Sequence, residues 1–209
     1  MARFADQTIS DFVEALANSE PTPGGGTAAA VAGAIGTSLL MMVAGMSKIR
    51  GSHESSRTQL DAARTALAST RARMLALADQ DSEAYNSVIA AYRLPKATDE
   101  EKATRKQAIG HGVRAATDAP LETFRTVVQA GQHARIVAQF GNPSAASDVR
   151  VALELLEAAA SGAAANVEAN LAGVTEDAFK KTAASTMIDL SNQLTEDIAS
   201  ARAALAQLI

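Results

Sequence analysis

The sequence predicts an all-α protein, a single-domain helical bundle that spans residues 1–209. Of the 209 residues, 47% are hydrophobic but only 3% are aromatic, and the many alanines favour helices. Apolar residues recur at steps of three and four, and no hairpin turn separates alternating segments. The prolines divide the chain into segments that are too long for strands. These prolines are Pro21, Pro23, Pro95, Pro120 and Pro143.

The first expected elements are a short helix at residues 10–17, a loop at residues 18–26 and a helix at residues 27–46. Residues 27–46 contain no charged side chain, and their number would suit a membrane span. Most of them are small or weakly apolar, however, and no second segment of this kind follows. We therefore predict a helix buried on all sides in a bundle, without a membrane.

A long helix is predicted for residues 54–93, where the chain contains neither glycine nor proline. At about 1.5 Å per residue this helix is about 60 Å long. A rod of that length extends beyond one small domain, so it either bends or packs against a second copy. We expect a homodimer or a larger symmetric oligomer.

Thr98 and Glu101 have the spacing of a capping box, which predicts a helix that begins there and ends near residue 113. Pro120 is expected to separate this helix from the next one. The remaining helices are expected at residues 120–138, 144–171 and 175–208.

Composition excludes several classes of function. The chain has no cysteine, so it has no disulfide, thiolate nucleophile or cysteine-ligated metal. A net charge of −4 and few aromatic residues count against nucleic-acid binding. The three histidines lack ligand spacing, so no metal site is expected. An acid within the first six residues, with no apolar segment after it, does not resemble a secretory signal, and we expect a cytoplasmic protein.

Asp81 is the most informative residue of the long helix, because it interrupts an apolar stripe between Leu77 and Ala84. An ionised carboxylate is costly to bury unless it is paired, so its pKa shifts upward or it has a partner. One interpretation is a structural aspartate that bridges neighbouring helices. The other is a general acid or base, which needs a pKa closer to neutrality.

A second candidate site is the segment Pro23-Gly24-Gly25-Gly26-Thr27. Glycines ahead of a helix let free backbone amides converge at its positive end, which suits an anion or a polar ring edge. The segment matches neither a P-loop nor a dinucleotide motif. The alternative is a tight turn that lets two helices touch.

Asp148 and Asn166 share one face of a later predicted helix. They are eighteen residues apart, about 27 Å along the helix axis, so they cannot serve one site within one chain. Asp148 also suits the first turn of its helix, where it complements the helix dipole. Asn142 precedes a proline and is typical of a turn.

These segments together resemble the cyclodeaminase/cyclohydrolase family, which includes the carboxy-terminal domain of formiminotransferase-cyclodeaminase and stand-alone methenyltetrahydrofolate cyclohydrolases. The resemblance is carried by residues 21–27 with the uncharged helix after them, residues 81–86, residues 94–96, Gly141-Asn142 and Ser147-Asp148. It implies an all-helical dimer that acts on one-carbon-substituted tetrahydrofolate and needs no cofactor beyond the folate itself.

The resemblance also implies site residues. Asp81 matches the catalytic aspartate of the family. Many members carry a lysine-rich patch after the uncharged helix, where this chain has only Lys48 and Arg50. The expected substrate-binding residues are Pro23, Gly24, Gly25, Gly26, Thr27, Lys48, Arg50, Tyr85, Lys96, Asn142 and Asp148.

Two activities fit the resemblance. A cyclohydrolase would open 5,10-methenyltetrahydrofolate to 10-formyltetrahydrofolate, and a cyclodeaminase would release ammonia from 5-formiminotetrahydrofolate as the ring closes. A chain without an attached formiminotransferase domain favours the cyclohydrolase. A third hypothesis is a helical protein without catalysis that binds a ligand or a partner helix, and the depleted basic patch supports it.

Overall fold

The computed structural model describes residues 3–46, 48–50 and 54–207. It confirms the all-α prediction, since the described residues form helices and no strands. Two single 3₁₀ turns are present, η1 (Phe4–Asp6) and η2 (Pro143–Ala145). The α-helices are α1 (Ile9–Ala17), α2 (Gly25–Ala44), α3 (Glu54–Tyr92), α4 (Asp99–Phe140), α5 (Ala146–Leu171) and α6 (Asp177–Ala206).

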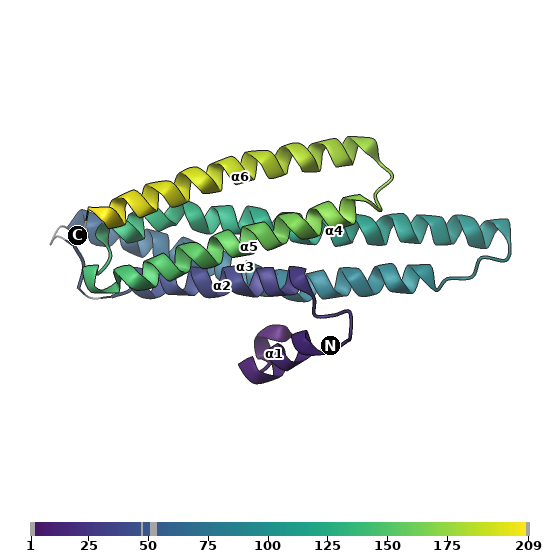
Figure 1. The fold of residues 1–209 in the computed structure, drawn as a ribbon, viewed down its shortest axis with the longest axis horizontal. Coiled ribbons are helices and arrows are strands. Elements are labelled where there is room, and N and C mark those ends of the chain that lie inside the picture. The colour runs from purple at the N-terminus through teal and green to yellow at the C-terminus, as the bar shows by residue number, and fades with distance from the viewer. Residues whose placement is uncertain (1–2, 47, 51–53, 208–209) are drawn as a thin grey trace.

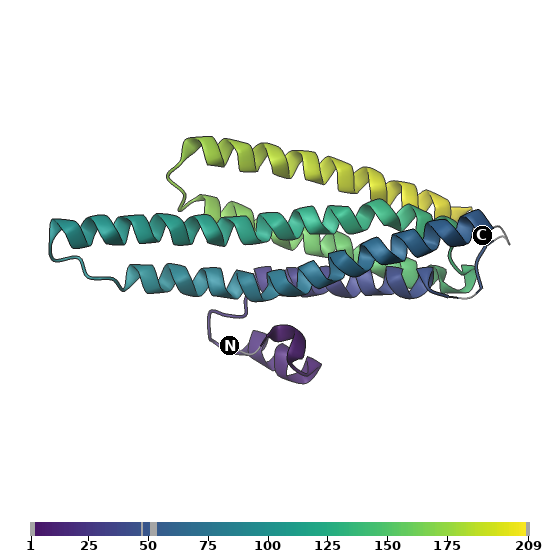
Figure 2. The same cartoon turned by 180° about the vertical axis from the view of Figure 1, so that it is seen from behind.

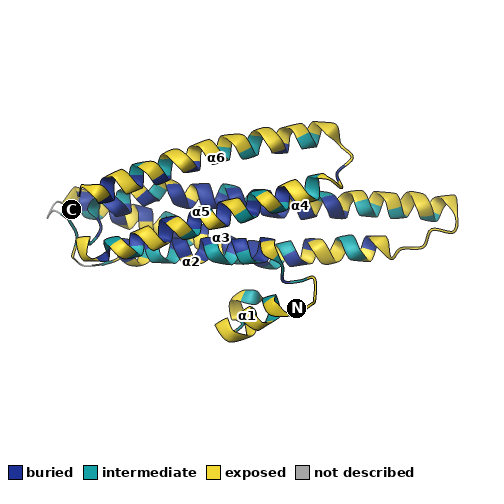
Figure 3. Cartoon of the chain, viewed as in Figure 1, coloured by how far each residue is buried: buried dark blue, intermediate teal, exposed yellow. Residues whose placement is uncertain are grey.

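The five long helices lie roughly along one axis (Figures 1 and 2). Helix α2 packs against α3 and α5, and α4 packs against α3, α5 and α6. The α3–α4 hairpin extends beyond the other helices, whereas α1 stands away from the bundle on the side of α2 (Figure 1). Figure 3 shows that burial is concentrated where the long helices overlap and that α1 and the tip of the hairpin are mostly exposed.

Helix α2 is the one helix in the described part of the chain that is long and apolar enough to cross a membrane. Over half of its most apolar segment, 56%, is buried inside the molecule. Thr27, Ala30, Leu40 and Val43 are fully buried against the other helices. These contacts are those of a core helix in a bundle. The prediction of burial on all sides was nevertheless wrong, because Ile35 and Met42 are exposed.

Helix α3 confirms the long predicted helix and continues without a break from Glu54 to Tyr92. Its apolar stripe is buried, with Leu60, Leu67 and Met74 fully inaccessible to solvent. The repeat of three and four residues therefore places one side of α3 against the core for most of its length.

The capping box at the start of α4 is also confirmed. Thr98 Oγ1 accepts a hydrogen bond from the Glu101 amide at 3.1 Å, and the Glu101 carboxylate accepts one from the Thr98 amide at 3.0 Å. Two amides that the helix leaves without an internal partner are thereby satisfied.

The predicted break at Pro120 is wrong, because α4 runs through this proline. Proline has no amide proton, so the carbonyl of Ala116, four residues earlier, loses its helical hydrogen bond. Asn170 on α5 replaces it, donating from Nδ2 to the Ala116 carbonyl at 2.6 Å. A side chain from another helix thus removes much of the cost of the proline.

We expect Asn170→Ala to lower the free energy of unfolding by about 1–3 kcal/mol, because it leaves the Ala116 carbonyl without a partner. In a Pro120→Ala background the loss should be smaller, since an alanine amide can bond that carbonyl within α4. Urea denaturation of the wild type, both single variants and the double variant measures this coupling. Equal losses in the two backgrounds would contradict the explanation.

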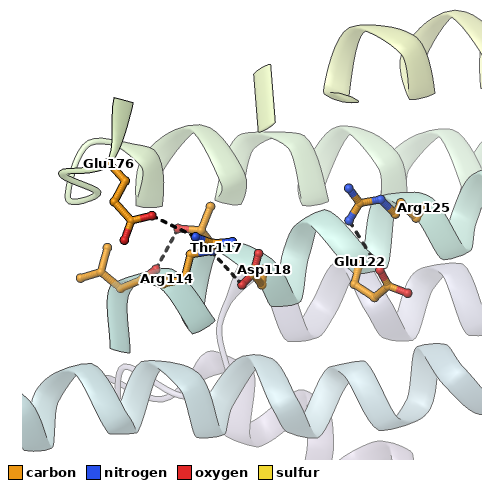
Figure 4. Close-up of polar contacts among 7 residues, drawn as sticks. Arg114, Thr117, Asp118, Glu122, Arg125 and Glu176 are labelled. Atoms are coloured by element: carbon orange, nitrogen blue, oxygen red, sulfur yellow. Dashed lines mark hydrogen bonds and ion pairs between the residues drawn. The ribbon is translucent and has the colours of Figure 1, made fainter. Parts of the chain in front are cut away.

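Polar contacts join the first turn of α6 to α4 (Figure 4). Arg114 lies 3.2 Å from both Asp118 and Glu176, and its guanidinium stacks on the Phe179 ring at 3.6 Å. Exposed ion pairs contribute at most about 1 kcal/mol each. These contacts therefore orient α6 on α4, while the apolar core supplies most of the stability.

Candidate active site

Asp81 lies on α3 against the first turn of α2. The Thr27 hydroxyl is 3.1 Å from Asp81 Oδ2, 3.2 Å from the Ala78 carbonyl and 3.0 Å from Ser82 Oγ. Thr27 is fully buried and Ser82 is 1% exposed. Because a hydroxyl carries a single proton, Thr27 cannot donate to Asp81 and Ala78 at the same time. The Asp81 carboxylate can therefore still accept hydrogen bonds from other donors, although it is partly buried.

Gly26 makes this contact geometrically possible. A side-chain carbon at residue 26 would overlap the Asp81 carboxylate, so the carboxylate lies directly on the glycine backbone. Gly24 caps α2 without a side-chain hydrogen bond. The first turn of α2 thus offers backbone amides and the positive end of the helix dipole next to Asp81.

Asn166 lies on the other side of this turn and was not among the predicted site residues. A side-chain carbon at Gly25 would lie 3.3 Å from Asn166 Nδ2. That nitrogen donates to the Gly162 carbonyl at 2.8 Å. The only sequence signal was its position, on the same helix face as Asp148 but too far away to share a site with it.

Burial raises the pKa of Asp81, and hydrogen bonds from the Thr27 side chain and backbone oppose that shift. Removal from solvent disfavours the charged form more than these two bonds favour it. The carboxyl group consequently exchanges its proton at a higher pH than an exposed aspartate does. This property suits a general acid or base.

The raised pKa predicts how stability depends on pH. Below the ordinary aspartate pKa of about 4, Asp81 is protonated in both the folded and the unfolded chain. As the pH rises through the higher folded-state pKa, the unfolded chain releases its proton first, so the stability that Asp81 contributes is lost. Relative to the wild type, Asp81→Asn should gain stability as the pH rises. Unfolding measured at several pH values tests this, and a constant difference would contradict it.

The structure brings several predicted substrate-binding residues to this place. Pro23 is buried, and Gly24 to Thr27 lead into and form the first turn of α2. Tyr85 lies one helical turn beyond Asp81 and is 39% exposed. Lys96 is farther away, in the loop between α3 and α4.

Four other predicted residues lie elsewhere. Lys48 and Arg50 follow the opposite end of α2, which is about 30 Å from its first turn. The Arg50 amide donates to the Phe140 carbonyl at 2.9 Å. Asn142 accepts from the Ser144 amide at 3.0 Å, as a turn residue does, and Asp148 lies in the first turn of α5. One chain therefore does not bring these four residues to Asp81.

The described ranges contain no set of side chains that could act as metal ligands. No group of three histidine, aspartate or glutamate side chains there could hold a metal ion. The site offers one carboxylate, hydroxyl groups, an amide and free backbone amides. Such groups recognise a polar organic ligand and can move one proton.

A family model described as formiminotransferase-cyclodeaminase matches residues 8–188 of the chain. The chain belongs to this family. The resemblance read from the motifs is thereby confirmed, and the match includes both the glycine turn and Asp81.

The chain is similar to curated proteins that carry two different enzyme names. A methenyltetrahydrofolate cyclohydrolase from Methylorubrum extorquens is 37% identical over 174 residues, which cover 83% of this chain and 84% of that protein. The formimidoyltransferase-cyclodeaminase of Rattus norvegicus is 34% identical over 176 residues. These cover 84% of this chain but only 32% of the rat protein.

A solved structure shares the fold. The formiminotetrahydrofolate cyclodeaminase of Thermotoga maritima superposes with a TM-score of 0.86 and covers 98% of both chains. Its sequence identity is 24%. This likeness confirms the helical architecture.

Proposed function

We propose that this protein hydrolyses 5,10-methenyltetrahydrofolate to 10-formyltetrahydrofolate, with Asp81 as general base and acid. The observation that carries the proposal is the half-buried carboxyl group of Asp81, which has a raised pKa, lies directly on the backbone of Gly26 and accepts a hydrogen bond from Thr27. The name of the Methylorubrum cyclohydrolase, 84% of which is covered by the match, supports the same reaction.

In this mechanism the Asp81 carboxylate takes a proton from water as the water oxygen bonds to the bridging carbon of the cationic substrate. It returns this proton to N5 as the bond between that carbon and N5 breaks. The remaining hydroxyl proton goes to solvent as the formyl carbonyl forms. One carboxyl group is therefore sufficient, and no cofactor beyond the folate is required.

The second candidate is the deamination of 5-formiminotetrahydrofolate, for which Asp81 would protonate the departing ammonia. The names of the rat and Thermotoga proteins favour it. The chain spans only about a third of the rat protein, however, and the Thermotoga likeness supports the fold alone. The cyclohydrolase is therefore our first proposal.

Absorbance of the methenyl-folate chromophore separates these functions. With purified protein, in a buffer where spontaneous hydrolysis is slow, we expect faster loss of the chromophore. A cyclodeaminase would instead generate the chromophore from the formimino substrate. No change in either assay would contradict both enzymes and favour the helical ligand-binding protein without catalysis.

The assembly and location belong to the same proposal. We place the enzyme in the cytoplasm as a homodimer. Two features of the chain support the dimer: the hairpin of α3 and α4 extends beyond the bundle, and α2 exposes Ile35 and Met42 to solvent. Light scattering of the purified protein gives the mass of the assembly directly.

A further inference from the structure

Two hydroxyl groups in the interior of the bundle form a hydrogen-bonded chain that ends at Asp81. Ser82 Oγ lies 3.0 Å from Thr27 Oγ1, which lies 3.1 Å from Asp81 Oδ2. Thr27 is fully buried and Ser82 is 1% exposed. Because these two hydroxyl groups are shielded from solvent, they act on the reaction through Asp81 and not by contact with the substrate.

The direction of the bond between Ser82 and Thr27 follows from their burial. Within the part of the chain that the structure describes, Thr27 is the hydrogen-bond partner of the Ser82 hydroxyl. A buried hydroxyl that donates to nothing is costly, so Ser82 donates and Thr27 Oγ1 accepts. The Thr27 proton then goes to one of two other neighbours, Asp81 Oδ2 or the Ala78 carbonyl at 3.2 Å.

The charge of Asp81 decides between these two acceptors. A hydrogen bond to an ionised carboxylate is about twice as strong as one between neutral groups. The Ala78 carbonyl lies within α3 and already accepts the helical hydrogen bond of the residue 82 amide. Thr27 therefore donates to Asp81 while Asp81 is ionised. Once Asp81 is protonated this advantage is lost, and the Thr27 hydroxyl can turn to the Ala78 carbonyl without losing its own proton.

The Thr27 amide contacts the same carboxylate. Thr27 is the third residue of α2, and its backbone donates a second hydrogen bond to Asp81. A side chain at the cap position normally accepts from this amide, but Gly24 at the cap of α2 has none. Asp81 therefore caps α2 from another helix, and the two donors of Thr27 fix the direction of its carboxylate.

Burial and the hydrogen bonds from Thr27 account for the shift in the Asp81 pKa. Helix α2 has no ionisable side chain, and α5 contributes the uncharged amide of Asn166 beside Gly25. The ionisable residues that α3 and η1 bring near Asp81 are exposed or half-buried. They are Asp79, Glu83 and Tyr85 on α3 and Arg3 and Asp6 at η1. Thr27 is therefore the residue whose removal should change the protonation of Asp81.

We propose that Thr27 and Ser82 are positioning residues for Asp81, in which Ser82 donates to Thr27 and Thr27 donates to the carboxylate while it is ionised. When Asp81 takes the proton of the attacking water, the Thr27 hydroxyl turns to the Ala78 carbonyl. It turns back when that proton passes to N5. Neither hydroxyl loses its proton, so the pair stabilises both forms of the base without taking part in the transfer. This inference rests on the proposed function for the reaction that Asp81 catalyses.

Thr27→Val removes the hydroxyl and keeps the branched shape of the side chain. We expect it to raise the pKa of Asp81 and to move the titration midpoint upward by about one pH unit, because a hydrogen bond to a charged group contributes about that much. Carbon-13 NMR of the aspartate carboxyl groups measures this without substrate, and Asp81→Asn identifies the signal. Thr27→Ser, which restores a hydroxyl, should return the midpoint to near its wild-type value. An unchanged midpoint in Thr27→Val would overturn the proposal.

The pH profile of kcat/KM separates positioning from a general loss of structure. Thr27→Val should lower kcat/KM about tenfold on the acid side of the midpoint, since one pH unit changes the ionised fraction about tenfold. On the alkaline side it should approach the wild-type value. An equal loss at every pH would contradict the proposal. Wild-type turnover in the chromophore assay tests the proposed function separately, and the NMR titration keeps its meaning if that function fails.

Thr37→Val is the matched control, because Thr37 is equally buried on α2 but donates to the Gly33 carbonyl within its own helix at 2.8 Å. It should leave the midpoint and the pH profile unchanged. Circular dichroism shows whether each variant folds.

Ser82→Ala is a second test, which remains available if Thr27→Val does not fold. Loss of the donor to Thr27 weakens the next bond in the chain, so the midpoint should rise by up to about a third as much as in Thr27→Val. In the Thr27→Val background Ser82→Ala should add no further shift, because Ser82 acts through Thr27. No shift from Ser82→Ala alone, or the same shift in both backgrounds, would contradict the order of donors.

Discussion

Asp81→Asn should reduce kcat by about 100- to 10,000-fold, which is the usual contribution of a positioned general acid or base. Asparagine has nearly the same size and can still accept from Thr27, so the fold should persist. It cannot take a proton from water at neutral pH. The loss should therefore appear in kcat, with a smaller change in KM.

Glu83→Gln is the matched control, because it removes an exposed carboxylate two residues away on α3. This variant should keep wild-type kcat. In the wild type, kcat/KM should rise with pH through the raised pKa of Asp81, since the carboxylate is the form that accepts the proton. Wild-type turnover by Asp81→Asn would end the assignment of this residue as the catalytic base.

The sequence was most informative where local periodicity determines structure. The stripe of α3 is regular enough that Asp81 stands out as one polar residue among buried apolar ones, and the structure places it half-buried against Thr27. The capping box could be predicted equally well, because Thr98 and Glu101 are only three residues apart. In both cases the sequence pattern and the contacts that it predicts lie within a few helical turns of each other.

What could not be predicted depends on contacts between distant segments. Pro120 stays within α4 because Asn170 on another helix bonds the Ala116 carbonyl, and no local rule reveals that partner. Asn166 belongs beside Gly25 only because α5 packs along α2. The spacing of the motifs along the chain gave no sign that some of them lie at opposite ends of α2.

Gly26→Ala should reduce both activity and stability, because its methyl group would overlap the Asp81 carboxylate. The overlap involves backbone and a side chain held on α3, so α2 and α3 must move apart or Asp81 must turn away. Overpacking of this kind costs about 1–3 kcal/mol of folding free energy. Displacing the carboxylate by about 1 Å should lower kcat about 100-fold.

Gly110→Ala separates this effect from the general consequences of replacing glycine in a helix. A side-chain carbon at residue 110 would meet nothing within 4 Å. This variant should therefore gain about 0.5–1 kcal/mol from the higher helix propensity of alanine and keep full activity. Chemical denaturation and the chromophore assay, applied to both variants, measure the two effects. If Gly26→Ala behaved like Gly110→Ala, the close contact between Asp81 and the α2 backbone would have no role in holding the catalytic carboxylate in place.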